Sequence, residues 1–300
     1  MMPAMRFRLA VLLTVSACLT TGCDTHADPK PAAVSRPSET AAPQGDPKEA
    51  FRDARLDVLE ANTGFYRVSA VLGPLTLLTQ GQYDLEREAT TARYSIAQPD
   101  IGQIVVDAVV IGEGGGWMRF VSGMDMTKPS CWFSIAELAR VGVEQDVPQA
   151  ELLVGGVAGV PLPLEVILRG TVDHRDGDRL LGHSTLLGLS GSVSAKFPAA
   201  LGLVDYDKTG RVTFELTDGR LTGWRTRMGD ILQDAERAGL EVPKAMQVYQ
   251  DYKDSMGGIS VLLSQTGRDL TIEPPPRELI VKPVADDKEF ERRLMSCPEE

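Results

Sequence analysis

The side chains with the most distinctive chemistry in this chain are its four cysteines, Cys18, Cys23, Cys131 and Cys297. A cysteine thiolate can be acylated, oxidised to a disulfide or bound to a metal ion. No Cys-x-x-Cys pair occurs, and Cys131 and Cys297 are too far apart in the sequence to suggest a metal site. The cysteines therefore favour acylation or disulfide formation, and their surroundings decide between the two.

A short apolar run near the N-terminus, residues 9–19, predicts export. It is about half as long as the ~20 residues that a membrane-spanning helix needs. Arg6 and Arg8 precede it without any acidic residue, and small residues follow it. This basic, apolar and then cleavable order is typical of a secretory signal. We predict that residues 1–22 are a signal peptide and that the mature protein works outside the cytoplasm.

The end of this run, Leu19–Cys23 with sequence LTTGC, resembles the lipobox of bacterial lipoproteins. In that pattern the cysteine thiol receives a diacylglycerol, and the chain is cut just before the cysteine. Gly22 fits the pattern, whereas Thr20 replaces the usual leucine. Cleavage at Cys18 would leave an apolar core of only about six residues, shorter than signals use. We predict a diacylglycerol on Cys23 that anchors the protein to the cell membrane, with an ordinary signal peptide as the alternative.

Residues 23–46 are rich in Pro, Ala, Ser and Thr and contain no large apolar side chain. Such a segment cannot bury enough surface to offset its ordering entropy, so we expect a disordered tether. The chain as a whole has a formal net charge of -11. That charge argues against a nucleic acid as partner, and against membrane attachment through a basic patch. It also serves simply to keep an exported protein soluble.

The two remaining cysteines, Cys131 and Cys297, form a candidate disulfide. In an oxidising compartment a leftover pair of cysteines is reasonably interpreted as a bond. The alternative is two unpaired thiols, one buried beside Trp132 and one on a loose tail.

Capping residues predict a helix at the start of the folded region. Asp46 can cap it, Pro47 suits its first position, and Glu49 completes a capping box. Asn62–Gly64 ends it. Its apolar face follows a three- and four-residue spacing: Phe51, Ala54, Val58 and Ala61.

Beyond this helix the apolar pattern changes to a period of two, which predicts an antiparallel meander. Asp218-Gly219 forms the clearest hairpin turn, between 212–216 and 221–228. The expected strands are 65–73, 79–86, 91–97, 103–112, 116–122, 164–174, 180–190, 212–216, 221–228, 259–267 and 269–281, and the expected helices 134–142, 149–157, 194–203 and 230–252. Together they predict one α+β domain over residues 47–283, followed by an acidic tail at 284–300.

Several short motifs in this order resemble a known family. They are LRGTVDH, FPAALGL, GRVTFELTDGRLTGWRTRM and LTIEPPPRELI. The chain from about Ala50 to Val281 resembles the actinobacterial LppX/LprG lipoprotein family, whose domain is a LolA-like half-barrel. The resemblance implies a strongly curved antiparallel sheet with helices packed on its concave face. It also implies an apolar cavity between them that binds or carries lipids or lipidated glycans. Cys131, Cys297 and the tail after Pro283 depart from the family pattern.

Small residues at several expected sheet and helix positions would leave room for such a cavity. They are Ala70, Gly81, Gly155, Gly156 and Gly191. A solid core is the alternative, since apolar strand residues usually fill space.

Sequence patterns for enzymes and metal sites are weak, so we predict no enzyme, no cofactor and no metal. The three histidines are His26, His174 and His183, too few for most catalytic triads or metal sites. Around Gly188 the sequence GLSGS lacks the last glycine of a nucleophile elbow. The segment 205–216 matches an EF-hand in part, but Leu216 occupies its last ligand position, so we predict an ordinary turn before a strand.

The sequence thus predicts an exported, membrane-anchored binder or carrier of an apolar ligand. One alternative is a tethered envelope lipoprotein without a cavity that binds a protein partner through a sheet edge or its tail. The other is a hydrolase of unrecognised type, for which Ser190 and His183 would be the first residues to test.

Overall fold

Helix α1 (Pro47–Ala61) begins the folded part of the protein as the sequence predicts. In the computed structural model the Asp46 side chain accepts a hydrogen bond from the Lys48 backbone N–H at 3.0 Å. The apolar face is buried, and the helix ends at Asn62, whose φ of 57° is left-handed.

The structure describes residues 45–72, 75–98, 102–112, 115–122, 131–137, 160–193, 196–203, 206–244, 246–247, 257–283, 286, 288–289 and 292–293. The predicted signal peptide, most of the tether, Cys18, Cys23, Cys297 and most of the acidic tail lie outside this part. Among the described residues, no helix combines the length and the apolar content needed to cross a membrane.

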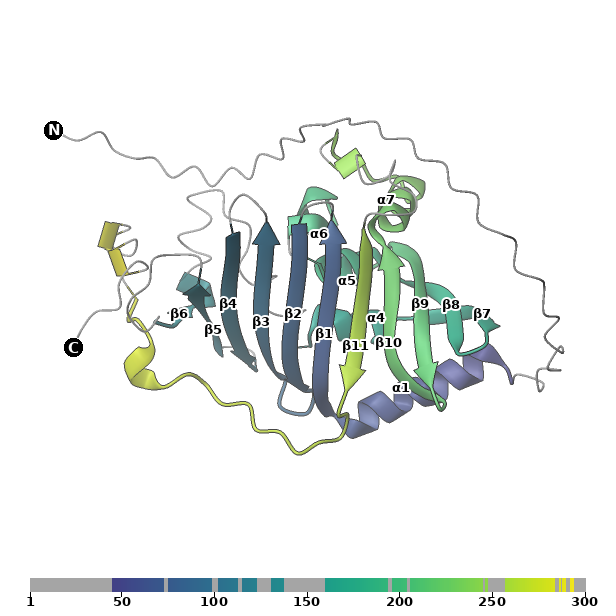
Figure 1. Ribbon diagram of the computed structural model, residues 1–300, viewed down its shortest axis with the longest axis horizontal. Helices are drawn as coiled ribbons and strands as arrows, with labels where there is room; N and C mark the ends of the chain where they lie inside the picture. The colour runs from purple at the N-terminus through teal and green to yellow at the C-terminus, as the bar shows by residue number, and fades with distance from the viewer. Residues whose placement is uncertain are drawn as a thin grey trace, which may run out of the picture. The chain divides into compact units, whose positions relative to one another are not determined.

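A single antiparallel sheet of eleven strands dominates the fold (Figure 1). The strands are β1 (Thr63–Leu72), β2 (Leu75–Asp84), β3 (Ala89–Gln98), β4 (Gly102–Ile111), β5 (Gly115–Ser122), β6 (Phe133–Ser134), β7 (Thr171–Asp176), β8 (Arg179–Thr185), β9 (Thr209–Thr217), β10 (Arg220–Arg227) and β11 (Gly258–Ser264).

The strand order is β6-β5-β4-β3-β2-β1-β11-β10-β9-β8-β7. Two meanders therefore meet at the sheet centre, where β1 pairs with β11 along Phe65–Ala70. The sheet is not closed into a barrel, because β6 and β7 remain as its two edges. This confirms an α+β fold built on a large antiparallel sheet, whereas the strong curvature of a half-barrel stays a prediction.

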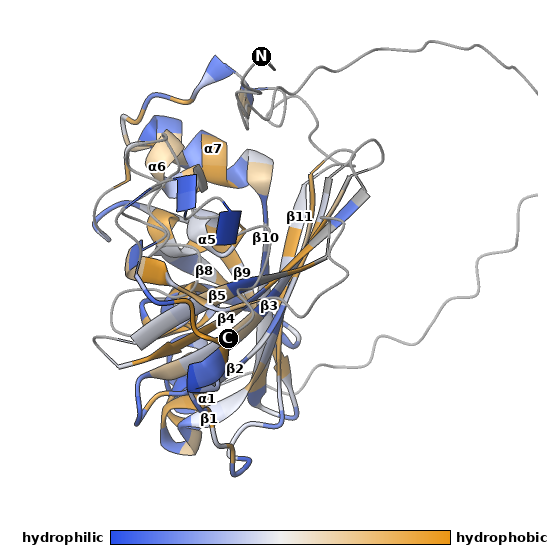
Figure 2. Ribbon diagram, turned by 90° about the vertical axis from the view of Figure 1, so that its left-hand side faces the viewer, coloured by the Kyte–Doolittle hydropathy of each residue, from blue (hydrophilic) through white to orange (hydrophobic). Residues whose placement is uncertain are grey.

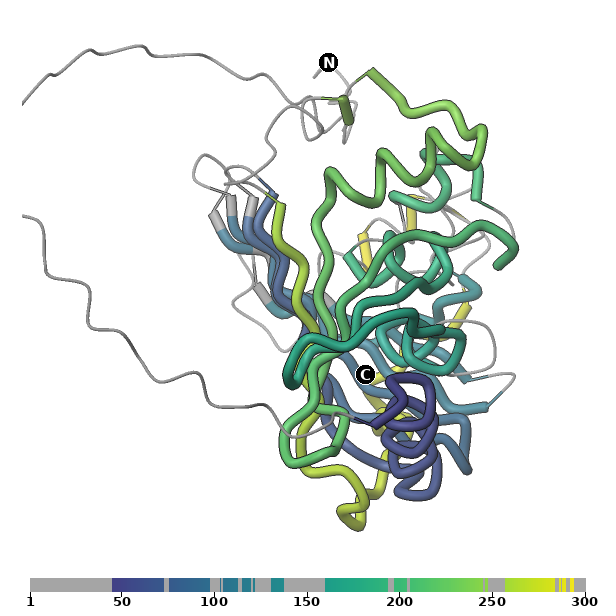
Figure 3. Tube along the Cα trace, turned by 90° about the vertical axis from the view of Figure 1, so that its right-hand side faces the viewer, coloured from purple at the N-terminus to yellow at the C-terminus, as the bar shows by residue number. Residues whose placement is uncertain are grey.

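Among the described residues, four further α-helices with defined bounds lie on one face of the sheet (Figures 2 and 3). They are α4 (Leu162–Leu168), α5 (Leu186–Gly191), α6 (Lys196–Ala200) and α7 (Met228–Arg237). Helices α4, α5 and α7 contact strands β8, β9 and β10, and α1 contacts β7 and β10. We call the face that bears the core residues Val68, Trp224 and Val261 the inner face, and the opposite one the outer face.

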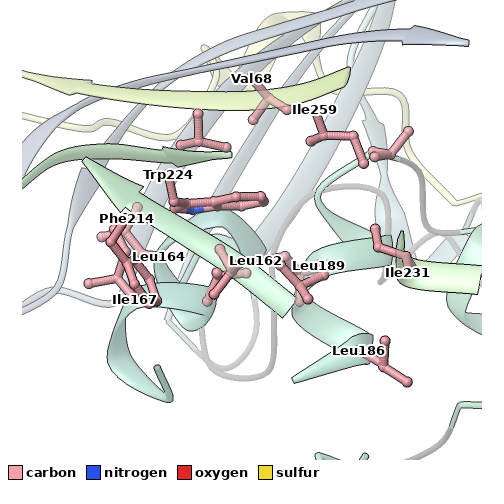
Figure 4. Close-up of a cluster of buried hydrophobic side chains, with 14 of the residues drawn as sticks. Val68, Leu162, Leu164, Ile167, Leu186, Leu189, Phe214, Trp224, Ile231 and Ile259 are labelled. Carbon is pink, nitrogen blue, oxygen red and sulfur yellow. The ribbon is translucent and has the colours of Figure 1, made fainter. Parts of the chain in front are cut away.

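The main core fills the space between the inner face and these helices (Figure 4). Trp224 of β10 is fully buried there, and its Nε1–H donates to the Pro163 carbonyl at 2.8 Å. Phe214 of β9 is paired with Trp224 across the strands and is also fully buried. The strand pair thus anchors the start of α4 to the sheet.

Two predicted strands were wrong in part. The segment 164–174 begins as helix α4, and strand β7 starts only at Thr171. In the segment 180–190 strand β8 ends at Thr185, whose side chain accepts a hydrogen bond from Gly188 N–H and caps α5. Nearly every side chain in α4 and α5 is buried, so their apolar runs carry no period that separates helix from strand.

The predicted strand at 269–281 is also wrong. After β11 the chain turns at residues 265–267, continues without regular secondary structure and then forms a short 3₁₀ helix, η2 (Arg277–Leu279). It then makes one parallel bridge, from Ile280 to Trp132, outside the ladder of the sheet. Pro274, Pro275 and Pro276 lack backbone N–H donors, which explains why this segment does not continue as a strand.

Candidate binding groove

A groove of about 740 Å³ opens on the outer face of the sheet, opposite the face that bears α4, α5 and α7. It is lined by residues of β1 to β5, β10 and β11 and by Trp132. This volume is in the range of ordinary ligand pockets, roughly 300–1,000 Å³. The groove mixes apolar residues, among them Phe65, Val109 and Leu262, with three arginines.

The charged side chains of the groove, together with Gln80, form a single row across five strands. The pairing register places Arg67 of β1 opposite Gln80 of β2, and Gln80 opposite Arg93 of β3. It continues from Arg93 to Asp107 of β4 and from Asp107 to Arg119 of β5. We call these five residues the arginine row. Side chains alternate between the faces of a strand, so one register brings them all to the outer face.

Asp107 holds two of the arginines. Arg93 donates from Nε to Oδ1 at 2.6 Å and from Nη2 to Oδ2 at 3.0 Å. Arg119 donates to Oδ2 from Nε at 2.9 Å and from Nη2 at 2.7 Å. Asp107 is only 7% exposed. Burial raises the pKa of Asp107, but the hydrogen bonds and charges of Arg93 and Arg119 outweigh burial and hold it below its ordinary value.

Arg67, in contrast, makes no side-chain hydrogen bond or ion pair with the described residues. Its side chain is exposed, and its partners in register are the uncharged Gln80 and Leu262. The groove therefore contains three arginines against the single carboxylate of Asp107. It is a positive site on a chain whose formal net charge is -11.

Apolar side chains border the row on both sides. Leu262 of β11, next to Arg67, is 51% exposed. At the other end the Trp132 ring lies 4.7 Å from Cζ of Arg119, within cation–π range. Trp132 and Val109 also belong to a small apolar cluster on the outer face that includes Ala89 and Ile272.

The segment after β11 secures this end of the groove. Trp132 N–H donates to the Leu279 carbonyl at 2.8 Å, and Val281 N–H donates to the Trp132 carbonyl at 2.9 Å. Leu279 and Ile280 pack against the small cluster. The segment after β11 is therefore fastened beside β6.

Of the cysteines with predicted roles, the structure describes only Cys131. It is 7% exposed and directly precedes Trp132, where the segment after β11 is fastened. Cys297 lies further along that segment, outside the described residues. The Cys131–Cys297 disulfide and the lipidation of Cys23 stay predictions.

Ser190 and His183 are not arranged as a catalytic pair. The Ser190 hydroxyl is fully buried in α5 and donates to the Leu186 carbonyl at 2.6 Å. His183 lies on β8 with its Nδ1 2.9 Å from Oδ2 of Asp173, and both side chains are exposed. Within the part of the chain that the structure describes, no group of three His, Cys, Asp or Glu side chains could hold a metal ion.

Two of the small residues expected to leave room for a cavity are packed against side chains instead. A methyl group added at Gly81 would lie 2.5 Å from Cζ of Tyr66, because the Tyr66 ring covers that glycine. One added at Gly191 would lie 2.6 Å from Cδ1 of Leu162. Ala70 is fully buried in the main core, and Gly155 and Gly156 lie outside the described residues.

Comparison of the chain with protein-family models and with curated proteins gave no match. The groove must therefore be interpreted from its own residues. The sequence analysis did not predict this groove, although the spacing of its polar residues indicates it. Arg67, Gln80, Arg93, Asp107 and Arg119 are polar residues at nearly equal intervals along the first meander, as a row across hairpin-linked strands requires.

Proposed function

We propose that the protein is an exported lipoprotein, anchored to the cell membrane by a diacylglycerol on Cys23, that binds a lipid-like amphipathic ligand. The observation that supports it best is the groove of about 740 Å³, in which exposed apolar side chains adjoin a row of arginines. An amphipathic molecule needs both kinds of surface.

The proposal places the ligand on the outer face rather than between the sheet and the helices. Around Trp224 the inner face is filled by the main core, and the Gly81 and Gly191 positions are packed. The outer groove is open and contains Leu262, an apolar side chain that is half exposed. The half-barrel curvature implied by the family resemblance belongs to this proposal, since curvature would shape the walls of such a groove.

Native mass spectrometry of the wild-type protein, purified from bacterial membranes in mild detergent, tests the binding function. We expect an added mass that solvent extraction identifies as a lipid or another amphiphile, at about one molecule per chain. A ligand-free mass that incubation with a lipid extract of the host does not change would contradict the proposal.

That second result would favour a tethered protein that binds a protein partner. The outer face supports this alternative through Leu262 and Val71, which are 51% and 44% exposed. Large exposed apolar patches often mark interaction surfaces.

The anchor has its own test, since Cys18 provides a matched control for Cys23. Bacteria that express each variant are fed an alkyne-tagged fatty acid, and label on the protein is measured. We expect Cys23→Ser to abolish labelling, because the serine hydroxyl replaces the thiol that receives the diacylglycerol. Cys18→Ser should be labelled like the wild type. Labelling that survives Cys23→Ser, or that is lost in Cys18→Ser alone, would show that the anchor site is wrong.

A further inference from the structure

We propose that Arg67 and Arg93 together hold the phosphate group of an anionic phospholipid-type ligand, above Gln80 in the outer groove. This inference rests on the proposed function and specifies the chemical class of its ligand.

The arginine row carries a net positive charge that a bound anion can balance. Asp107 balances only one of the two arginines that it binds, so Arg93 and Arg119 keep one net positive charge. Arg67 adds a second, because it has no ionic partner among the described residues. A groove of one charge sign attracts ligands of the opposite sign even on a protein of net charge -11.

The positions of the available hydrogen-bond donors favour a phosphate site between Arg67 and Arg93. Arg93 uses Nε and Nη2 to bind Asp107, so its Nη1 hydrogens remain available. Arg67 is two strands away in the same row, which places the two Cα atoms about 10 Å apart. Two long arginine side chains can converge over that distance on one tetrahedral oxyanion, which guanidinium groups bind with paired hydrogen bonds. Gln80 lies between them and adds an amide donor.

Apolar surface next to this interval favours a lipid over a free anion. Leu262 is the neighbour of Arg67 on the side away from Gln80, and Phe65 lies two residues before Arg67 on the same face of β1. A hydrocarbon chain beside Leu262 and Phe65 would keep its phosphate at the arginines. A polyanion such as a nucleic acid fits poorly, because the net charge of the whole chain would repel it.

The test compares three probes by isothermal titration calorimetry with the wild-type protein. They are dihexanoyl phosphatidic acid and dihexanoyl phosphatidylcholine, both below their micelle concentrations, and inorganic phosphate. We expect phosphatidic acid to bind at least tenfold more tightly than either other probe, and its affinity to fall as salt is added.

Arg67→Gln is the decisive variant, because Arg67 has no described partner and its loss leaves the fold intact. We expect it to weaken phosphatidic acid binding about tenfold, as loss of a charged hydrogen bond does, and to weaken phosphatidylcholine binding much less, because the choline cation already balances the charge of that phosphate. Arg93→Gln should weaken it to a similar extent. Arg220→Gln is the matched control, since it removes the same charge from an exposed position in the β9–β10 hairpin outside the groove. Its affinity should stay within twofold of the wild type.

Each contrary result has a distinct meaning. If both lipids bind equally and Arg67→Gln changes neither affinity, the phosphate site is wrong, but the proposed function stands. If inorganic phosphate binds as tightly as phosphatidic acid, the inference that the ligand is a lipid is wrong. No binding of either lipid refutes this inference, and it refutes the proposed function as well only if native mass spectrometry also finds no ligand.

Discussion

Replacement of Trp224 by alanine is expected to lower the free energy of unfolding by about 3–5 kcal/mol, the usual cost of truncating a large buried aromatic residue. Trp224 is fully buried between the inner face and α4 (Figure 4). Its Nε1–H donates to the Pro163 carbonyl. The alanine variant leaves a cavity and also removes the donor of that hydrogen bond. Because most domains are stable by only 5–15 kcal/mol, the loss should be plain in urea denaturation followed by circular dichroism.

Two further variants separate the parts of this effect. Trp224→Phe keeps most of the apolar volume but removes the hydrogen bond to the Pro163 carbonyl, so we expect a smaller loss of about 1–3 kcal/mol. Leu262→Ala changes an apolar residue on the neighbouring strand, at an outer-face position that is 51% exposed. It should cost less than about 1 kcal/mol. Equal losses for Trp224→Ala and Leu262→Ala would contradict the assignment of inner and outer faces.

The parts of the fold that the sequence predicts correctly are those specified by neighbouring residues. The cap at Asp46 and the apolar face of α1 are local features, and both are confirmed. The hairpin turn is also local. Asp218 and Gly219 have φ values of 52° and 78°, the left-handed pair that an Asp-Gly turn between strands adopts.

The wrong assignments occur where burial removes the pattern. The β-branched residues Val166 and Ile167 favour the predicted strand at 164–174. Leu162–Leu168 is instead a helix that is buried on nearly all sides. The start of α5 had a usable signal in Thr185, an N-cap residue, which the apolar run after it concealed. Helix α4 packs against α5 and β8, and α5 packs also against β9, so contacts with other elements bury both helices.

The candidate site could not be predicted from the sequence for a different reason. Each member of the arginine row is an ordinary polar residue at an outward position of its own strand, and only the register of four successive strand pairs aligns them. A slip of one residue in any pair would turn the following side chains to the inner face. The family resemblance directed attention to that inner face, whereas the groove lies on the outer one.

The ion pairs that this register gives Asp107 should also contribute to the stability of the fold. Asp107→Asn should lower the free energy of unfolding by about 2 kcal/mol at pH 7, because a nearly buried carboxylate that accepts charged hydrogen bonds is lost. The cost stays below that of a fully buried ion pair, since the Arg93 side chain is 57% exposed and can return to water. Asp173→Asn is the control. Its pair with His183 is exposed, so we expect a change below about 0.5 kcal/mol.

The pH dependence of this loss has a definite sign. The folded pKa of Asp107 lies below its ordinary value of 3.8, so the carboxylate stabilises the folded state above that pH. Its contribution declines as the pH falls through 3.8 toward the folded pKa, where the carboxyl group becomes protonated. The difference in free energy of unfolding between the wild type and Asp107→Asn should therefore be constant from pH 7 to about 5 and shrink below pH 4. Urea denaturation of both proteins across this range measures it. A difference that grows on acidification would mean that Arg93 and Arg119 do not hold Asp107 ionised, and the charge argument for an anion in the groove would then fail as well.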